Sequence, residues 1–158
     1  FRGGADRVGS VRLSARVDYA LRAASELAAA DAPRTVEQLS AAQHIPNKYL
    51  ESILGELRRG GLLRSQRGPE GGYRLARPAT EISIADVIRA LDGELANVRG
   101  SRPEHLDYSG AASALQQVWI ALRASERTIL EGVTLAHVSS GELPEFVSTL
   151  VANPAAWT

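Results

Sequence analysis

The 158-residue chain lacks cysteine and methionine, and no apolar run in it is long enough to cross a lipid bilayer. The missing thiols exclude disulfides, cysteine-ligated iron–sulfur clusters, cysteine-type zinc sites and a cysteine nucleophile. The opening FRGGADRVGS has no apolar core of the kind that a secretory signal needs. We therefore expect residues 1–10 to be a flexible extension or a cloning remnant, and the protein to be cytoplasmic without a membrane partner.

Basic and acidic residues are equal in number, yet they are unevenly distributed along the chain. The formal net charge is zero. Residues 33–78 carry eight Lys and Arg against four Asp and Glu, whereas residues 79–158 carry five Arg against ten acidic residues. A basic centre indicates a region that meets a polyanion such as a nucleic acid, although chance scatter of surface charge gives the same counts.

Helix signals are clear at the start of the chain. Ser14 is suited to cap a first helix, whose apolar face covers residues 17–28. A break at residues 31–33 follows, and Thr35 with Gln38 has the pattern of a capping box. The chain is therefore expected to enter its basic centre through a short helix.

A second short helix is predicted from Pro46 or Asn47 to Arg59, after a tight turn at His44. The glycines at 60–61 end it, since glycine tolerates the left-handed backbone that closes a helix. Its apolar stripe consists of Tyr49, Leu50, Ile53, Leu54 and Leu57. A short helix, a tight turn and a second helix with a polar outer face form a helix-turn-helix.

A β-hairpin is predicted directly after this helix. Residues 63–67 and 73–77 are the expected strands, and the Gly-Pro-Glu-Gly-Gly segment at 68–72 is the turn. The hairpin carries four arginines, Arg64, Arg67, Arg74 and Arg77. Glycine in the turn allows positive φ and close approach of the backbone to a phosphate. Such a hairpin is a wing, so residues 11–93 are expected to form a winged helix-turn-helix domain.

The C-terminal half is predicted to contain one long helix. A helix from Ser83 to Asp92 is followed by an aperiodic connector at 94–110, and then by a helix over 111–138. The long helix carries an apolar stripe of Leu115, Val118, Trp119, Leu122, Ile129 and Val133. A small domain cannot cover so long a helix, so a second copy is expected to cover the stripe in a homodimer. Residues 139–158 are expected to hold a short helix and a tail.

The fold class expected is thus mainly α with a small β-hairpin, and the sequence resembles the Rrf2 family of winged helix-turn-helix transcriptional regulators. The resemblance covers about residues 11–137. It is carried by residues 12–14, 18–22, 49–51, 57–58, 60–63, 67–75 and 82–92. Its most specific part is the Gly-Pro-x-Gly-Gly-Tyr wing after the second short helix.

The resemblance implies a bacterial repressor that binds a pseudo-palindromic operator on double-stranded DNA as a homodimer. The second short helix would enter the major groove, and the wing would lie at the adjacent minor groove. The candidate DNA contacts are Arg12, Ser14, Thr35, Asn47, Lys48, Glu51, Ser52, Arg58, Arg67, Gly68, Pro69, Gly71 and Gly72.

Each of these roles has a structural alternative. Lys48 and Ser52 also suit a solvated helix surface. Glu51 is able to accept a hydrogen bond from cytosine N4, or to pair instead with Lys48 or Arg58. The tyrosines at 19, 49 and 73 are expected to be packing residues.

One departure from the family is chemical. Its sensing members hold three cysteines in the segment that corresponds here to residues 94–108, and this chain has none. We therefore expect no iron–sulfur cofactor and no metal. Residues 104–107 offer a histidine and carboxylates for a weak metal site, or simply a solvated loop. Trp119 could line a cavity for a small-molecule effector, or belong to the dimer core.

The sequence is also compatible with two other functions. A winged helix can serve as a protein–protein interaction module, with the acidic C-terminal half as its surface, and a regulator can be controlled by a partner enzyme. An enzyme is disfavoured, and no catalytic residue is predicted. The three histidines of the chain, His44, His105 and His137, are scattered along the sequence. The sequence also has no phosphate-binding loop and no nucleophile elbow.

Overall fold

The structure is a computed structural model that describes residues 13–93, 95 and 100–158. The predictions for residues 1–10, for Arg12 and for part of the connector lie outside these residues. The described part is mainly helical with a two-stranded antiparallel sheet, which confirms the predicted fold class. The elements are α1 (Ala15–Ala29), α2 (Val36–Gln43), α3 (Asn47–Arg59), β1 (Leu63–Gln66), β2 (Gly72–Leu75), α4 (Ile84–Asp92), α5 (Leu115–Gly132), α6 (Leu135–Ser140) and α7 (Glu145–Ala152). Short 3₁₀ turns cover Ala79–Glu81, Pro103–His105, Gly110–Ala112 and Pro154–Trp157.

The predicted helix starts are confirmed by their caps. The hydroxyl of Ser14 accepts a hydrogen bond from the N–H of Val17 at 3.2 Å. Thr35 and Gln38 form a reciprocal capping box, with hydrogen bonds of 3.0 and 3.1 Å. These bonds satisfy N–H groups that have no partner inside the helix, which is why helices begin at these residues.

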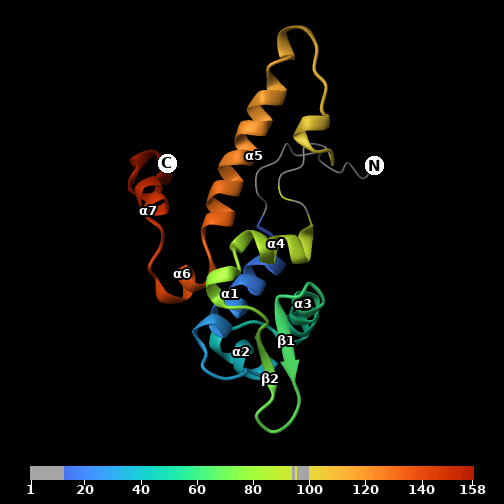
Figure 1. Cartoon of the computed structure of the whole chain (residues 1–158), viewed down its shortest axis with the longest axis vertical. Helices are drawn as coiled ribbons and strands as arrows, with labels where there is room; N and C mark the ends of the chain where they lie inside the picture. The colour runs from blue at the N-terminus through green and yellow to red at the C-terminus, as the bar shows by residue number, and fades with distance from the viewer. Residues whose placement is uncertain (1–12, 94, 96–99) are drawn as a thin grey trace.

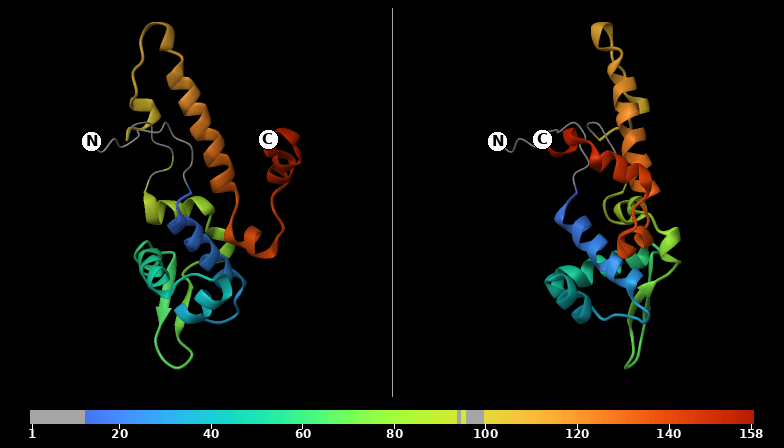
Figure 2. Two further views of the ribbon diagram at one scale, coloured as in Figure 1. Left: turned by 180° about the vertical axis from the view of Figure 1, so that it is seen from behind. Right: turned by 90° about the vertical axis from the view of Figure 1, so that its left-hand side faces the viewer.

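The molecule has a compact body and a projecting arm, which consists of α5, the chain that leads into it and α7 (Figure 1). Helices α1 to α4 and the hairpin form the body, and the tip of the hairpin points away from it at one end. Helix α5 projects from the opposite side of the body. The chain that leads into α5 runs outward beside it, and α5 then runs back toward the body (Figures 1 and 2). One end of the molecule is thus formed by the tip of the β-hairpin, and the other end by the start of α5.

The prediction of one helix over 111–138 is wrong in its bounds, because α5 runs from Leu115 only to Gly132. Val133 and Thr134 leave the helix with extended backbone, and Thr134 becomes the cap of α6. Val133 was expected in the exposed stripe, but only 4% of its surface is exposed.

The end of α5 is fixed by contacts with a distant part of the chain. Ser83 and Thr134 form an antiparallel bridge. The N–H of Leu135 donates to the carbonyl of Ile82 at 2.9 Å, and the N–H of Ile84 donates to the carbonyl of Val133 at 3.0 Å. The bridge returns the chain to the body, where α6 packs against α1.

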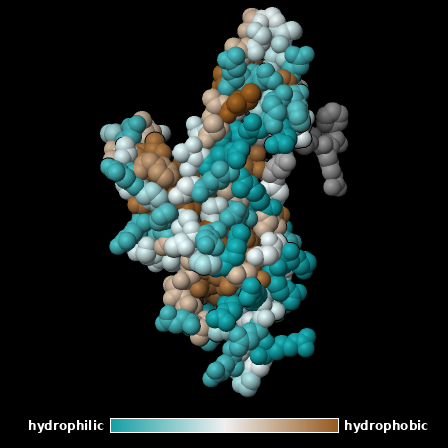
Figure 3. Space-filling view, viewed as in Figure 1, coloured by the Kyte–Doolittle hydropathy of each residue, from teal (hydrophilic) through white to brown (hydrophobic). Residues whose placement is uncertain are grey.

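Apolar side chains remain exposed on the arm. Neither α5 nor α7 contains a buried residue. In the space-filling view, hydrophobic residues gather over α7, next to α5 (Figure 3). An apolar surface of this kind is typical of a region that meets another molecule.

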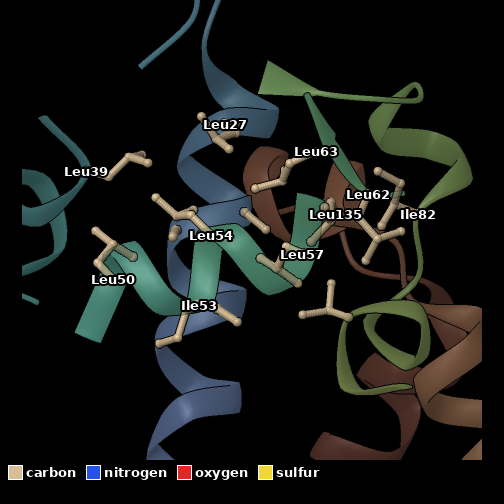
Figure 4. Packing of buried hydrophobic residues seen from close by; sticks show 14 of the residues in the cluster. Leu27, Leu39, Leu50, Ile53, Leu54, Leu57, Leu62, Leu63, Ile82 and Leu135 are labelled. Carbon is tan, nitrogen blue, oxygen red and sulfur yellow. The ribbon is translucent and has the colours of Figure 1, made fainter. Parts of the chain in front are cut away.

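The hydrophobic core lies inside the body (Figure 4). Leu50, Ile53, Leu54 and Leu57 of α3 face α1 and the first strand. Leu135 joins this cluster from α6. The core therefore holds α3 by one side only and leaves its other side at the surface.

Candidate nucleic-acid interface

The turn between α2 and α3 depends on an unusual backbone conformation. His44 ends α2 with φ 55° and ψ 46°, in the left-handed region, and its N–H donates to the carbonyl of Ser40. Ile45 follows and is buried in the core. The sharp turn reorients the chain, so that α3 crosses α2 as the second helix of a helix-turn-helix. His44 is therefore the C-terminal cap of α2.

Helix α1 braces both helices of this motif. The guanidinium of Arg22 donates to the backbone carbonyl and to the side-chain oxygen of Gln43 at the end of α2. Arg16 forms an ion pair with Glu56 of α3. These contacts fix the motif on its rear side and leave the outer side of α3 unobstructed.

The outer side of α3 is polar, as predicted. Its exposed residues include Asn47, Lys48, Glu51, Ser52 and Arg58. Within the described part of the chain, Glu51 makes no ion pair, so the alternative pairing with Lys48 or Arg58 is not observed. Its carboxylate is open to an external hydrogen-bond donor.

Tyr49 was predicted on the buried stripe of α3, and this prediction is wrong. Its side chain is 51% exposed, and the ammonium of Lys48 lies 4.9 Å from the centre of its ring. With Ser52 and residues of α1 it lines a surface groove of about 350 Å³. Tyr49 lies at the edge of the stripe, four residues before Ile53, and a ring with a polar tip is stable at such a boundary. It is an additional candidate for DNA contact.

The hairpin is closely joined to the helix-turn-helix. The N–H and carbonyl of Tyr73 exchange hydrogen bonds with the carbonyl and N–H of Arg34, at 2.7 and 2.9 Å. Gly72 has φ 137°, and a Cβ there would lie 2.4 Å from the carbonyl oxygen of Arg34. Glycine is therefore needed both for the backbone conformation and for this close approach. The hairpin is positioned as a wing beside α2 and α3.

The arginines of the wing have few acidic partners. Arg64 and Arg74 are directly opposite each other in the strand register, which brings two like charges together. Such a pair is unfavourable unless an anion lies nearby. Among the described residues, Arg64, Arg67 and Arg74 make no ion pair, whereas Arg77 lies 3.6 Å from Asp86. Three exposed guanidinium groups thus remain available for phosphates.

The other candidate DNA contacts differ in how available they are to an external partner. Thr35 accepts one hydrogen bond and keeps its own hydroxyl hydrogen available, at the N-terminus of α2. The hydroxyl of Ser14 is used within the chain, since it also donates to Asp92 at 3.4 Å. The turn residues Gly68 and Pro69 are exposed at the tip of the wing.

The residues of the arm are not part of this basic surface. Leu115, Val118, Leu122 and Ile129 are exposed along α5. Trp119, predicted with them, is instead partly buried in its own chain, and its indole N–H donates to the hydroxyl of Tyr108 at 3.0 Å.

The connector contains no metal-binding cluster within its described residues. The pKa of Glu104 is lowered by its own backbone N–H and then by Arg123 and Arg102. Its carboxylate is therefore held by cations rather than directed at His105. In the described part of the chain, no three His, Cys, Asp or Glu side chains gather at one place.

A helix-turn-helix whose second helix has a free polar face, with a basic hairpin beside it, defines a winged helix-turn-helix DNA-binding protein. Comparison with protein families agrees with this class. Residues 13–141 match the model of the Rrf2 family, described as iron-dependent transcriptional regulators. The chain belongs to the Rrf2 family and is a DNA-binding transcriptional regulator, not an enzyme.

Bacterial relatives carry the same designation. Rv1287 of Mycobacterium tuberculosis, named an HTH-type transcriptional regulator, is 54% identical over 142 residues, which are 89% of this chain and 88% of the relative. The HTH-type transcriptional regulator IscR of Cereibacter sphaeroides is 31% identical over 84% of this chain and 90% of its own length.

Solved structures share the fold. CymR of Bacillus subtilis, described as a global cysteine regulator, superposes with a TM-score of 0.72 at 28% identity, over 85% of this chain and all of CymR. IscR of T. potens gives a TM-score of 0.67 at 26% identity, over 94% of this chain and 98% of that one.

The family description mentions iron, but the residues of this chain do not fit a cysteine-ligated cluster. Segment 94–110 contains no cysteine, and neither does the rest of the sequence. No helix in the described part of the chain is long and apolar enough to span a membrane.

Proposed function

We propose that the protein binds a pseudo-palindromic operator as a homodimer and represses transcription from the adjacent promoter. This proposal rests on the unpaired charges at the surface of α3 and the wing. Glu51 and three wing arginines lack ion-pair partners in the described residues. An exposed carboxylate next to several free cations suits base reading within a frame of phosphate contacts.

Helix α3 enters the major groove in this proposal. Lys48 donates to guanine or to a phosphate, and Glu51 accepts from cytosine N4. Asn47 and Ser52 flank them on the same exposed side, and Arg58 contacts a phosphate. A carboxylate close to phosphates is repelled unless it meets a base donor, so Glu51 is the residue expected to determine sequence preference.

The wing and the start of α2 position the protein on the backbone. Arg67 and the glycine turn at 68–72 lie at the adjacent minor groove, whose negative potential attracts arginine where the groove is narrow. Thr35 donates its hydroxyl hydrogen to a phosphate at the N-terminus of α2, where free N–H groups also favour an anion. These contacts fix orientation and carry no base information.

The homodimer is formed by the exposed stripe of α5. The stripe, Leu115, Val118, Leu122 and Ile129, has no cover within the described chain. Leu115 and Ile129 are equally far from Leu122 in sequence, so two antiparallel copies of α5 would match the stripe to itself across a two-fold axis at Leu122. Such a dimer reads two half-sites of opposite orientation.

Repression follows from occupancy, because a dimer bound over a promoter excludes the polymerase. The protein acts in the bacterial cytoplasm, where the chromosome is. Its signal is not a cysteine-ligated iron–sulfur cluster, since the chain supplies no thiolate. A small molecule or a partner protein takes that role.

Selection of genomic DNA fragments on the purified protein, followed by sequencing, tests this function. We expect a recurring inverted repeat with half-sites about one helical turn apart, or a multiple of it. Transcription from a promoter carrying this repeat should fall when the protein is present. No enrichment at low salt, or equal recovery of all fragments, would contradict sequence-specific binding.

A further inference from the structure

A groove separates the two helices of the arm. It has a volume of about 660 Å³ and is lined by Ser125, Thr128, Ile129, Glu145, Phe146, Thr149 and Leu150. Ile129, Phe146 and Leu150 give the groove its apolar surface, and Glu145 is its one charged lining residue. The groove is open to the surface beside the hydrophobic residues of α7 (Figure 3).

The position of α7 beside α5 depends on a small residue. The ring of Phe146 lies over Gly132, and a Cβ at Gly132 would come 2.8 Å from the Phe146 ring. This contact holds the start of α7 against the end of α5. Further along α7, Leu150 is 50% exposed and Val151 is 47% exposed, so the helix is apolar but only partly covered.

The C-terminal segment lies outside the part of the chain that defines the family. The family match ends at residue 141, and α7 begins at Glu145. The DNA-binding motif and the stripe of α5 both lie within the match. A role for α7 must therefore be derived from its own surface.

The groove and the stripe of α5 are continuous, because Ile129 belongs to both. In the antiparallel arrangement, Ile129 of one chain meets the partner's Leu115. The N-terminal half of the partner's α5 would then lie between Leu122 and Ile129, with the partner's Val118 at the level of residue 126, beside the groove that Leu150 lines. The stripe of α5 is apolar and the surface of the groove is mostly apolar, so each covers what the other leaves exposed.

We propose that α7 of each chain closes over the N-terminal half of the partner's α5, so that the groove is an interface between two copies of this chain. The inference rests on the proposed homodimer and adds a second contact area to it. In a two-fold dimer this contact forms twice, once in each groove.

A charged substitution in the groove tests the contact. Leu150→Asp places a carboxylate in the interface, and we expect the dissociation constant of the dimer to rise about tenfold or more. Ser148→Asp is the matched control, because Ser148 is exposed on α7 but does not line the groove. Both variants and the parent chain are compared by sedimentation over a range of concentrations.

Disulfide cross-linking gives an independent test, because the chain contains no cysteine of its own. Val118→Cys and Leu150→Cys variants are mixed under reducing conditions and then oxidised. We expect a cross-linked heterodimer between positions 118 and 150, identified by peptide mass. Replacing Leu150→Cys with Ser148→Cys in the mixture should reduce the yield strongly, since disulfides form only between Cα atoms about 4.4–6.8 Å apart.

The outcomes separate this inference from the proposed function. A parent chain that is monomeric at every concentration contradicts the homodimer itself. A dimeric parent with equal dissociation constants for both Asp variants, and without the 118–150 cross-link, overturns the role of α7 alone. The hydrophobic dye 1-anilinonaphthalene-8-sulfonate gives the last readout. Its stoichiometric binding to the parent dimer, lost in Leu150→Asp, would mean that the groove is a ligand site and would also overturn the inference.

Discussion

The body and the arm of this protein differ in where their apolar side chains lie. In the body, Leu39, Leu50, Leu54 and Leu57 are each at most 1% exposed. In the arm, neither α5 nor α7 buries a single residue. The body therefore has a core that specifies its fold within one chain, whereas the arm leaves apolar side chains at the surface.

Charge divides the molecule in a related way. Several acidic and basic groups along the arm are paired, as in the contacts of Glu104 with Arg123 and of Glu131 with Arg127. The wing instead places Arg64 opposite Arg74. Paired charges in the arm offset each other, whereas the adjacent arginines of the wing favour the approach of an anion.

The largest effect is expected in the core of the body. Leu54→Ala removes a fully buried side chain and should lower the free energy of unfolding by about 2–5 kcal/mol. Denaturant unfolding followed by circular dichroism measures this. Leu13→Ala, at a side chain that is 59% exposed, is the control and should change stability by less than about 0.5 kcal/mol. Equal losses would remove the distinction between covered and exposed leucines.

The corresponding change in the arm should affect assembly rather than folding. Leu122→Asp places two carboxylates at the proposed two-fold axis and should weaken the dimer by about 2–4 kcal/mol. Mass photometry detects the resulting monomers. Ala124→Asp introduces the same charge at an exposed position outside the stripe and should leave the dimer intact. A persistent Leu122→Asp dimer would show that the stripe is covered in another way.

Sequence preference should depend on the outer side of α3. Glu51→Ala is expected to relax the preference at one base pair of each half-site by about 1–3 kcal/mol. Binding to a panel of single-base operator variants measures it. Glu81→Ala, at an exposed residue of the 3₁₀ turn Ala79–Glu81, should leave the panel unchanged. An unaltered preference in Glu51→Ala would assign Glu51 to a structural role.

The wing should contribute affinity without sequence preference. Arg67→Ala is expected to weaken binding to every DNA about tenfold and to reduce the slope of log affinity against log salt by about one. Fluorescence anisotropy at several salt concentrations gives both values. Arg77→Ala should lose much less, because that guanidinium lies 3.6 Å from Asp86. Unchanged affinity in Arg67→Ala would remove the wing from the interface.

The smallest effect is expected where the arm meets the body. Hydrogen bonds from Arg89 of α4 and then from Arg127 lower the pKa of Glu131 in the folded chain. A lowered pKa adds stability above the ordinary pKa of a glutamate, and this stability is lost as the pH falls through the lowered value. The groups are partly exposed, so Glu131→Gln should cost less than about 1 kcal/mol at pH 7. Unfolding at pH 7 and in acid measures this, and a larger cost in acid than at pH 7 would contradict the assignment.

The body was predictable from sequence because its signals are local. The capping box of Thr35, the glycines of the wing and the stripe of α3 each act within a few residues. The structure confirms the elements that they predict. The lack of room for a side chain at Gly72 was not predictable from local sequence, because the atom in the way is the carbonyl oxygen of Arg34, on a separate segment.

The arm was predicted less well because its geometry depends on distant contacts. The end of α5 is fixed by the bridge between Ser83 and Thr134, which helical periodicity does not report. Thr134 was a usable capping signal, but its partner His137 is not a residue of the usual capping box. Trp119 fits the helical stripe by spacing, yet its indole turns to Tyr108 on the connector.

In the proposed function, the body reads DNA while the arm joins two copies of it. Native mass spectrometry of the full chain with a selected operator, combined with anisotropy on the same operator and a shuffled duplex, tests this most directly. We expect two chains per operator and an affinity about a thousandfold or more above that for the shuffled duplex. One chain per operator, or equal affinity for both duplexes, would contradict the proposed function.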